Sequence, residues 1–268
     1  MNIAYLREET TPSGALRSVL AHADALVARG HRVRIVTKDQ PLAWRRSSAE
    51  WIYLDDFREY DAGDDDVVFD ASYIPKLVVE DEFFRAHDRT ENDPPRVLLC
   101  GSTQNERRGI PDGYGAVAHA RWFHQKLDLI RVSHWAPSRE EPLDAVQEFH
   151  VALTTDEMTR LMHSCDILLA PTHPNATLGT SAAEALASGL ACVLTAIPTY
   201  TSFASERDFA LFAPAHNPVE LGERLIELLG DEDLRAGLRE RARAVSHQWR
   251  VDRMTDQLEQ ELARARRR

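Results

Sequence analysis

The sequence predicts an α/β protein with two Rossmann-like parallel-sheet domains, of which the N-terminal one is reduced. Apolar strand-like runs alternate with amphipathic helical segments, and a strand–helix–strand unit opens the chain. A proline pair, Pro94-Pro95, then interrupts this alternation before a new buried strand. We therefore place a shortened N-terminal domain with its linker in residues 1–93 and a C-terminal domain in residues 94–268, whose last helix is a candidate for packing back on the N-terminal domain.

The N-terminal domain shows period-2 and helical apolar patterns in the order expected of a βαβ unit. Gly30-His31 ends the first helix before a strand of alternating apolar residues begins. The stretch from Lys76 to Pro95 is charged and polar, which is typical of a linker. The elements expected here are a strand at 2–6, a helix over 16–27, and strands at 32–37, 51–54 and 67–70.

The C-terminal domain alternates strands with helices that carry their own start and stop signals. Thr154 or Thr155 is a candidate N-cap, and Gly189 ends a helix of small residues. The strands expected here are 96–101, 127–132, 167–170 and 191–195. The helices expected here are 156–163, 181–188, 219–229 and 231–245, followed by a last helix from Trp249.

Composition and charge exclude several classes of function. The formal net charge of -11 makes general nucleic-acid binding unfavourable. The chain has no apolar run long enough for an integral membrane segment and no signal-peptide pattern at its start, so we expect a cytoplasmic protein. Three widely spaced cysteines favour buried thiols over a disulfide or zinc site. His22, on the first helix, is expected to be partly exposed.

Two loops of the C-terminal domain are candidates for an anion site, because ligands of parallel sheets bind at the carboxyl ends of strands. The first loop, residues 102–109, ends in Arg107 and Arg108, which could hold a diphosphate by paired hydrogen bonds. A solvated surface loop is the alternative interpretation. The second loop, residues 171–181, offers backbone N–H groups at a helix N-terminus, including those of Gly179 and Thr180.

Three further residues belong to this hypothesis. Glu184 either complements the helix dipole or accepts hydrogen bonds from the hydroxyls of a ribose. His173 lies beside the second loop and is a candidate ligand contact. Gly14, at the first strand–helix turn, is a candidate for facing the same crevice from the N-terminal domain, although a single glycine is a weak phosphate signal. The histidines show no metal-ligand spacing on any one helix.

Residues 178–189, from Leu178 to Gly189, resemble the donor-site signature of family 4 glycosyltransferases of the GT-B fold. Arg107-Arg108-Gly109-Ile110 resembles the Arg-Lys-Gly run of the phosphate loop in that family. The opening βαβ unit, the helix and strand at 158–171, and Trp249 at the start of the last helix follow the same order. The resemblance covers most of the chain.

The resemblance implies an enzyme that transfers a sugar from a nucleotide-diphosphate sugar to an unknown acceptor, with retention of configuration and without a metal or other cofactor. It implies that Glu184 binds the nucleotide ribose and that Arg107 or Arg108 neutralises the diphosphate. Gly179 and Thr180 would offer backbone amides to the donor, and residues 149–153 would lie where the family builds its base pocket.

The chain departs from the family pattern in two places. The family has a glutamate eight positions before the residue matched by Glu184, and Ala176 stands there instead. Asn175, next to it, can form hydrogen bonds with the donor but supplies no charge. The N-terminal domain also lacks several expected elements after residue 70, so a homodimer or a partner transferase is expected to cover its exposed surface. The alternative function is therefore a non-catalytic nucleotide-sugar-binding or helper subunit; a sugar-nucleotide epimerase has little support.

Overall fold

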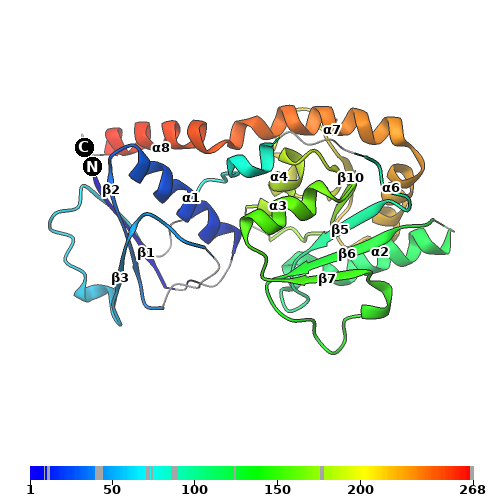
Figure 1. The fold of residues 1–268 in the computed structure, drawn as a ribbon, viewed down its shortest axis with the longest axis horizontal. Helices are drawn as coiled ribbons and strands as arrows, with labels where there is room; N and C mark the ends of the chain where they lie inside the picture. Colours follow the sequence, from blue (N-terminus) through cyan, green and yellow to red (C-terminus); the bar gives the residue numbers. More distant parts are fainter. Residues whose placement is uncertain are drawn as a thin grey trace. The chain divides into compact units, whose positions relative to one another are not determined.

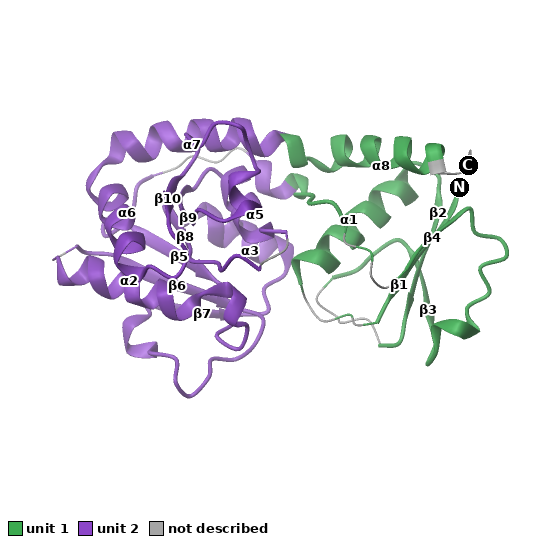
Figure 2. Ribbon diagram, turned by 180° about the vertical axis from the view of Figure 1, so that it is seen from behind, with its two compact units in different colours: residues 1–81, 248–268 green, residues 82–247 purple. Residues whose placement is uncertain are grey.

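The structure is a computed structural model that describes residues 1–8, 10, 13–39, 45–70, 73, 75–85, 90–123, 125–175 and 178–265. The chain divides into two compact units (Figure 2). Unit 1 comprises Met1–Asp81 and Gln248–Arg268, and unit 2 comprises Glu82–His247. Unit 1 ends at Asp81, ahead of the boundary that we placed between residues 93 and 94, and it includes residues 248–268, which we placed in the C-terminal domain. Among the described residues, no helix has the length and apolar character needed to cross a membrane.

Unit 1 contains a four-stranded parallel sheet in the order β3-β2-β1-β4. Its elements are β1 (Asn2–Arg7), α1 (Gly14–Ala28), β2 (Arg32–Thr37), β3 (Glu50–Tyr53), η1 (Phe57–Glu59), β4 (Val67–Phe69), η2 (Asp81–Phe84, which continues into unit 2) and α8 (Val251–Ala265). The strands and helix predicted from the sequence are all present, with ends that differ by up to two residues.

The core of unit 1 forms because alternate residues of each strand face α1 and α8. Ile3 and Tyr5 of β1 pack with Leu20 and Leu26 of α1, and Leu258 of α8 joins the same cluster. α8 lies along α1 in this unit (Figure 1). Ser13 caps α1 by accepting a hydrogen bond from the Leu16 N–H at 3.1 Å, which satisfies one of the amides that a helix start leaves unpaired.

His22 differs from its prediction, because it is 1% exposed on α1 and not partly exposed. Burial disfavours the imidazolium and lowers the pKa of His22 to about 4, with the nearby charge of Lys76 acting in the same direction. The wide apolar face of α1 explains the error: α1 packs against both the sheet and α8, so more of its circumference is buried than a surface helix would bury.

The buried imidazole predicts a pH-dependent loss of stability in unit 1. The unfolded chain binds the His22 proton near pH 6.5 and the folded chain near pH 4, so stability falls as the pH drops through this window. Between pH 7 and pH 5 the loss is about 2 kcal/mol from this residue. In His22→Leu the loss of stability between pH 7 and pH 5 is expected to be smaller by about 2 kcal/mol. Hydrogen exchange of the β1 amides at the two pH values measures this free energy. Parallel pH profiles for the two proteins would contradict the prediction.

Unit 2 contains a six-stranded parallel sheet in the order β10-β9-β8-β5-β6-β7 (Figure 2). Its strands are β5 (Arg96–Cys100), β6 (Asp128–Ser133), β7 (Glu148–Val151), β8 (Ile167–Ala170), β9 (Ala191–Thr195) and β10 (Leu211–Ala213). Its helices are η3 (Glu106–Arg108), α2 (Ile110–Trp122), η4 (Leu143–Ala145), α3 (Thr155–His163), α4 (Thr180–Ala187), α5 (Pro198–Thr201), α6 (Pro218–Gly230) and α7 (Glu232–Ser246), with η5 (His247–Trp249) leading into unit 1.

The strand order of unit 2 creates one switch point. The chain runs from β5 through β6 to β7 on one side, and then returns to β8, β9 and β10 on the other side. β5 and β8 are therefore adjacent, although their connections leave in opposite directions along the sheet. In open parallel sheets a ligand crevice forms at this point, outside the carboxyl ends of the two strands.

Candidate functional site

The two loops expected to bind an anion both start at the switch point of unit 2. The first loop follows β5 and leads through η3 into α2. The second loop follows β8 and leads into α4. The two loops are adjacent because the strands that they follow, β5 and β8, pair with each other.

The loop after β5 is shaped by a side-chain cap and a glycine. Asn105 accepts a hydrogen bond from the Arg107 N–H at 3.2 Å, which starts the turn that carries both arginines. Arg107 is exposed, whereas Arg108 is half-buried. A Cβ atom on Gly101 would lie 2.9 Å from Cγ of Arg108, so the stem of Arg108 packs against the end of β5.

The two loops are joined by backbone contacts. The N–H of His173 donates to the carbonyl of Arg107 at 2.9 Å. Gly109 has a φ of 61°, and a Cβ atom there would lie 1.9 Å from the carbonyl oxygen of Pro171. Only glycine permits this approach without displacing the backbone. The arginine-bearing loop is thus fixed to the loop that starts α4.

α4 begins at a second glycine in the left-handed region. Gly179 has a φ of 63° and provides no side-chain cap. A Cβ atom at this position would lie 2.8 Å from the ring of Tyr200, whose hydroxyl is 2.7 Å from Oγ1 of Thr172. Because the first amides of a helix have no intrahelical acceptor, the N–H groups at Thr180 and Ser181 are suited to an anion. Thr180 itself is buried, as is Gly179.

Glu184 lies in the second turn of α4 and is 2% exposed. Its charge and that of Arg108 both act on the Cys100 thiol at the end of β5. Burial raises the pKa of Cys100 to about 12, Glu184 adds to this shift, and Arg108 opposes it. Glu184 on α4 and Arg108 after η3 thus lie on the segments that follow the adjacent strands β8 and β5.

A buried arginine that the sequence analysis did not identify supports this strand end. Arg131 on β6 is fully buried and donates to Oε1 of Glu141 from Nε at 3.0 Å and from Nη2 at 2.7 Å. It also donates to the carbonyls of Leu99 at 2.6 Å and Gly101 at 2.9 Å. Tyr114 of α2 completes the group by donating to Glu141 at 2.9 Å. No motif marks such a pair, since its members come from a strand and a loop.

Some predicted site residues lie elsewhere. Gly14 is the first residue of α1 and belongs to unit 1, so its role stays a prediction. Asn175 is exposed in the turn after β8, and Ala176 and Thr177 lie outside the described residues. β7 covers most of the predicted base-pocket stretch, and its Phe149 ring lies 5.5 Å from the Arg131 guanidinium.

His173 contacts two side chains that the sequence analysis did not connect with it. Its Nε2 is 3.0 Å from Oδ2 of Asp112 on α2. Its ring lies 3.8 Å from the ring of His216, which precedes α6. The sequence analysis looked for metal-ligand spacing within single helices. Asp112, His173 and His216 follow three different strands, so that search could not connect them.

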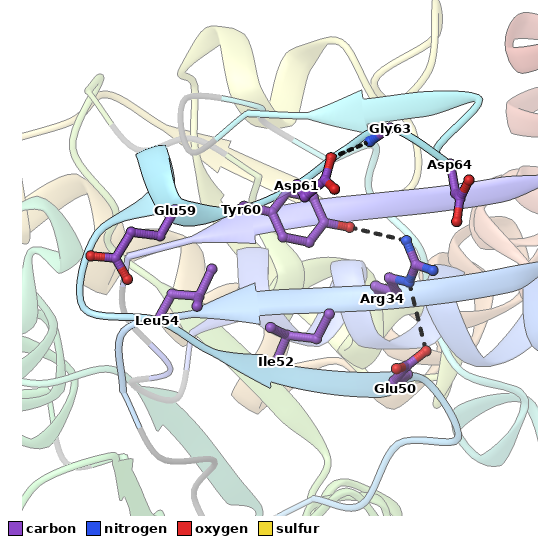
Figure 3. A pocket seen from close by; sticks show the side chains of 9 residues that line it. All are labelled: Arg34, Glu50, Ile52, Leu54, Glu59, Tyr60, Asp61, Gly63 and Asp64. Carbon is purple, nitrogen blue, oxygen red and sulfur yellow. Dashed lines mark hydrogen bonds and ion pairs between the residues drawn. The ribbon is translucent and has the colours of Figure 1, made fainter.

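Unit 1 has a separate polar pocket of about 340 Å³ on the sheet face of β2 and β3 (Figure 3). Its lining residues are Arg34, Glu50, Ile52, Leu54, Glu59, Tyr60, Asp61, Gly63 and Asp64. Arg34 donates to Asp65 at 2.9 Å and to Tyr60 at 3.4 Å, so its charge is engaged within the protein. Four lining carboxylates against one arginine make this pocket unfavourable for a diphosphate.

Comparison with known proteins agrees with the predicted fold. Residues 136–245 match the model of the family described as glycosyl transferases group 1. No curated protein sequence matches the chain. Two structural matches are a glycosyltransferase from Rickettsia africae ESF-5 (TM-score 0.70, 13% identity, 98% of each chain covered) and WaaG, a glycosyltransferase involved in lipopolysaccharide biosynthesis (TM-score 0.74, 16% identity, 96% of this chain and 98% of that chain). A third is Anabaena Alr3699/HepE in complex with UDP and glucose (TM-score 0.68, 13% identity, 97% and 99%).

These findings define the class of the protein. The two parallel-sheet units and their structural matches confirm the GT-B fold predicted from the sequence. The matched segment, which includes the loop after β8, Glu184 and most of α7, is similar to the glycosyl transferases group 1 family. The chain accordingly has the GT-B fold, and the family match over residues 136–245 agrees with the glycosyltransferase resemblance at residues 178–189.

Proposed function

We propose that the protein transfers a sugar from a nucleotide-diphosphate sugar to an acceptor, and that the donor binds at the β5–β8 switch point. The observation that carries the proposal is that Arg108, the start of α4 and the buried Glu184 all lie on the segments that follow the adjacent strands β5 and β8. Each of these groups suits one part of such a donor. The arginine suits the diphosphate, the amides at the helix start suit the adjoining phosphate or sugar, and the carboxylate suits the two ribose hydroxyls. The HepE structure with UDP and glucose, on a similar fold, supports this donor class.

Each residue of the site has a separate role in the proposed reaction. Arg107 and Arg108 would neutralise the diphosphate, which is the leaving group, as its charge grows in the transition state. The amides of Gly179 and Thr180 would position the adjoining phosphate or sugar. Glu184 would accept hydrogen bonds from both ribose hydroxyls. Catalysis would then rest on positioning and electrostatic stabilisation, and we propose retention of configuration with no metal ion in the transfer step.

The test is a panel of nucleotide-diphosphate sugars screened for binding by calorimetry and for hydrolysis or transfer. One donor is expected to bind measurably, and its free nucleoside diphosphate is expected to bind as well because most of the proposed contacts involve the nucleotide. A folded protein that binds neither class of compound would contradict the proposal.

Arg108→Ala is expected to weaken binding of that donor by roughly 10- to 150-fold, the equivalent of charge-assisted hydrogen bonds worth about 1.5–3 kcal/mol. Arg108→Lys is expected to recover part of the loss, because a lysine keeps the charge but not the paired donors. Arg224→Ala, which removes an arginine paired with Glu227 on the surface of α6, is the matched control. Equal effects of Arg108→Ala and Arg224→Ala would show that Arg108 does not contact the diphosphate.

A second candidate function is a helper subunit that binds a nucleotide sugar without turning it over. Ala176 in place of the family glutamate favours it, as does the small four-stranded sheet of unit 1. Val68 and Tyr53 of that unit are 39% and 41% exposed, so a second chain or a partner transferase has apolar surface to cover. Turnover by the purified chain alone would exclude this candidate. Sedimentation with and without candidate partners tests the association.

A further inference from the structure

Two histidines and one aspartate from three different connections come together in unit 2. Asp112 lies in the first turn of α2, His173 follows β8, and His216 lies between β10 and α6. One ligand atom from each residue lies within 4.8 Å of the others. The transfer reaction proposed above assigns no role to Asp112 or His216.

The distances within this group fit a first-row transition metal. Ligands about 2.0–2.1 Å from a tetrahedral zinc ion lie about 3.3 Å from one another. Nε2 of His173 and Oδ2 of Asp112 are 3.0 Å apart, close to that separation. The His216 ring is exposed and tilted by 38° against the His173 ring, and one ligand atom of His216 lies within 4.8 Å of the other two.

The kind and number of ligands also favour a metal over a chance contact. Imidazole nitrogens with one carboxylate oxygen form the donor set that Zn²⁺ and Co²⁺ accept readily. Asp112 and His173 are each 22% exposed at the side chain, and His216 is more exposed, so an ion has an open path to all three. Three protein ligands leave one coordination position for water.

The backbone at His216 adds an observation of its own. His216 has a φ of 60°, one of two such non-glycine residues among those described. This left-handed conformation costs of order 1 kcal/mol or more outside glycine, and such residues concentrate at binding sites. In this conformation the His216 imidazole lies 3.8 Å from the His173 ring, on the side where a third ligand would be needed.

We propose that Asp112, His173 and His216 form a binding site for one divalent transition-metal ion of the zinc type. The bound ion would join the start of α2, the loop after β8 and the turn before α6. Because the His173 N–H already donates to the Arg107 carbonyl, the ion would also fix the loop that carries the arginines. The site stands apart from the transfer chemistry, and its presence does not depend on the proposed function.

The experiment titrates the metal-free full-length chain with Zn²⁺ by calorimetry and with Co²⁺ by absorption spectroscopy. We expect one equivalent of metal per chain, a visible Co²⁺ spectrum typical of nitrogen and oxygen ligands, and a higher thermal midpoint with metal bound. His173→Gln and His216→Gly are each expected to weaken binding by at least about tenfold, since even loss of an outer-sphere partner costs that much.

His216→Gly keeps the test independent of folding, because glycine adopts the left-handed conformation without strain. The matched control is His119→Ala, which removes a histidine that pairs with Glu223 at 3.2 Å in the same unit. It is expected to leave the affinity and the Co²⁺ spectrum unchanged. The proposal is overturned if no saturable binding occurs, if His216→Gly binds as the parent does, or if His119→Ala loses the metal equally.

Discussion

Glu184→Gln is expected to weaken donor binding by roughly 10- to 150-fold while leaving unit 2 folded. The substitution keeps the shape of the side chain but removes the charge that would accept two ribose hydroxyls. Since Glu184 is 2% exposed, little water can replace the hydrogen bonds that the donor would form with its carboxylate. Each of these hydrogen bonds is therefore expected to contribute strongly to the affinity. Calorimetry with the donor identified by the panel, and with its nucleoside diphosphate, measures the effect.

The stability of the same variant separates a binding role from a structural one. The amide keeps the shape of the buried side chain, so the thermal midpoint is expected to stay close to that of the parent. Glu223→Gln, on the exposed face of α6, is the control that removes a negative charge without touching the site. A Glu184→Gln protein that melts earlier but binds the donor normally would assign Glu184 to the structure of α4.

The sequence was most informative where the structure is determined locally. Thr154 and Glu157 form a capping box at α3, and the predicted start of that helix is off by one residue. Gly189 follows α4 with a φ of 71°, as expected of a glycine that ends a helix. These signals lie within a few residues of the feature they predict, so no knowledge of tertiary contacts is needed.

The features that were not predicted from the sequence depend on contacts between distant segments. α2 was not predicted, because its apolar residues are interrupted by glycines and polar residues and only α6 and the sheet give them a partner. β10 is three residues long and depends on pairing with β9. The contacts of His173 with Asp112 and His216 likewise arise only once three separate connections meet. Such features follow from strand order, which no single window of sequence contains.

The candidate site contains residues of both kinds, some marked by a local sequence pattern and some defined only by tertiary contacts. Arg108, Gly179 and Glu184 were chosen by their type and spacing, and the strand order places their segments next to each other, since β5 and β8 are neighbours at the switch point. The supporting pair of Arg131 and Glu141 was missed, because an arginine within an apolar strand is not distinguished in sequence from one at the surface. The residues predicted to bind the donor follow a sequence pattern, whereas this buried pair does not.

That supporting pair yields the largest stability effect expected for any single substitution considered for this chain. Arg131→Met is expected to destabilise unit 2 by about 3–5 kcal/mol, because it leaves the Glu141 charge buried without its partner. The carbonyls of Leu99 and Gly101 also lose their guanidinium donor, so the end of β5 loosens. Urea denaturation followed by hydrogen exchange of the β5 and β6 amides measures this loss. Arg224→Met on the surface of α6 is expected to cost less than about 0.5 kcal/mol.

A double substitution distinguishes a buried ion pair from simple loss of packing. Arg131→Met combined with Glu141→Leu removes both charges, and the pair is expected to cost up to about 3 kcal/mol less than the sum of the single changes. Arg131 donates to the carbonyl of Gly101, which precedes the loop that carries Arg107 and Arg108, so under the proposed function Arg131 is a positioning residue. The double variant is therefore expected to regain stability without regaining donor affinity, because the guanidinium that fixes Gly101 is still missing. Additive single effects, or full recovery of donor binding, would contradict this role for Arg131.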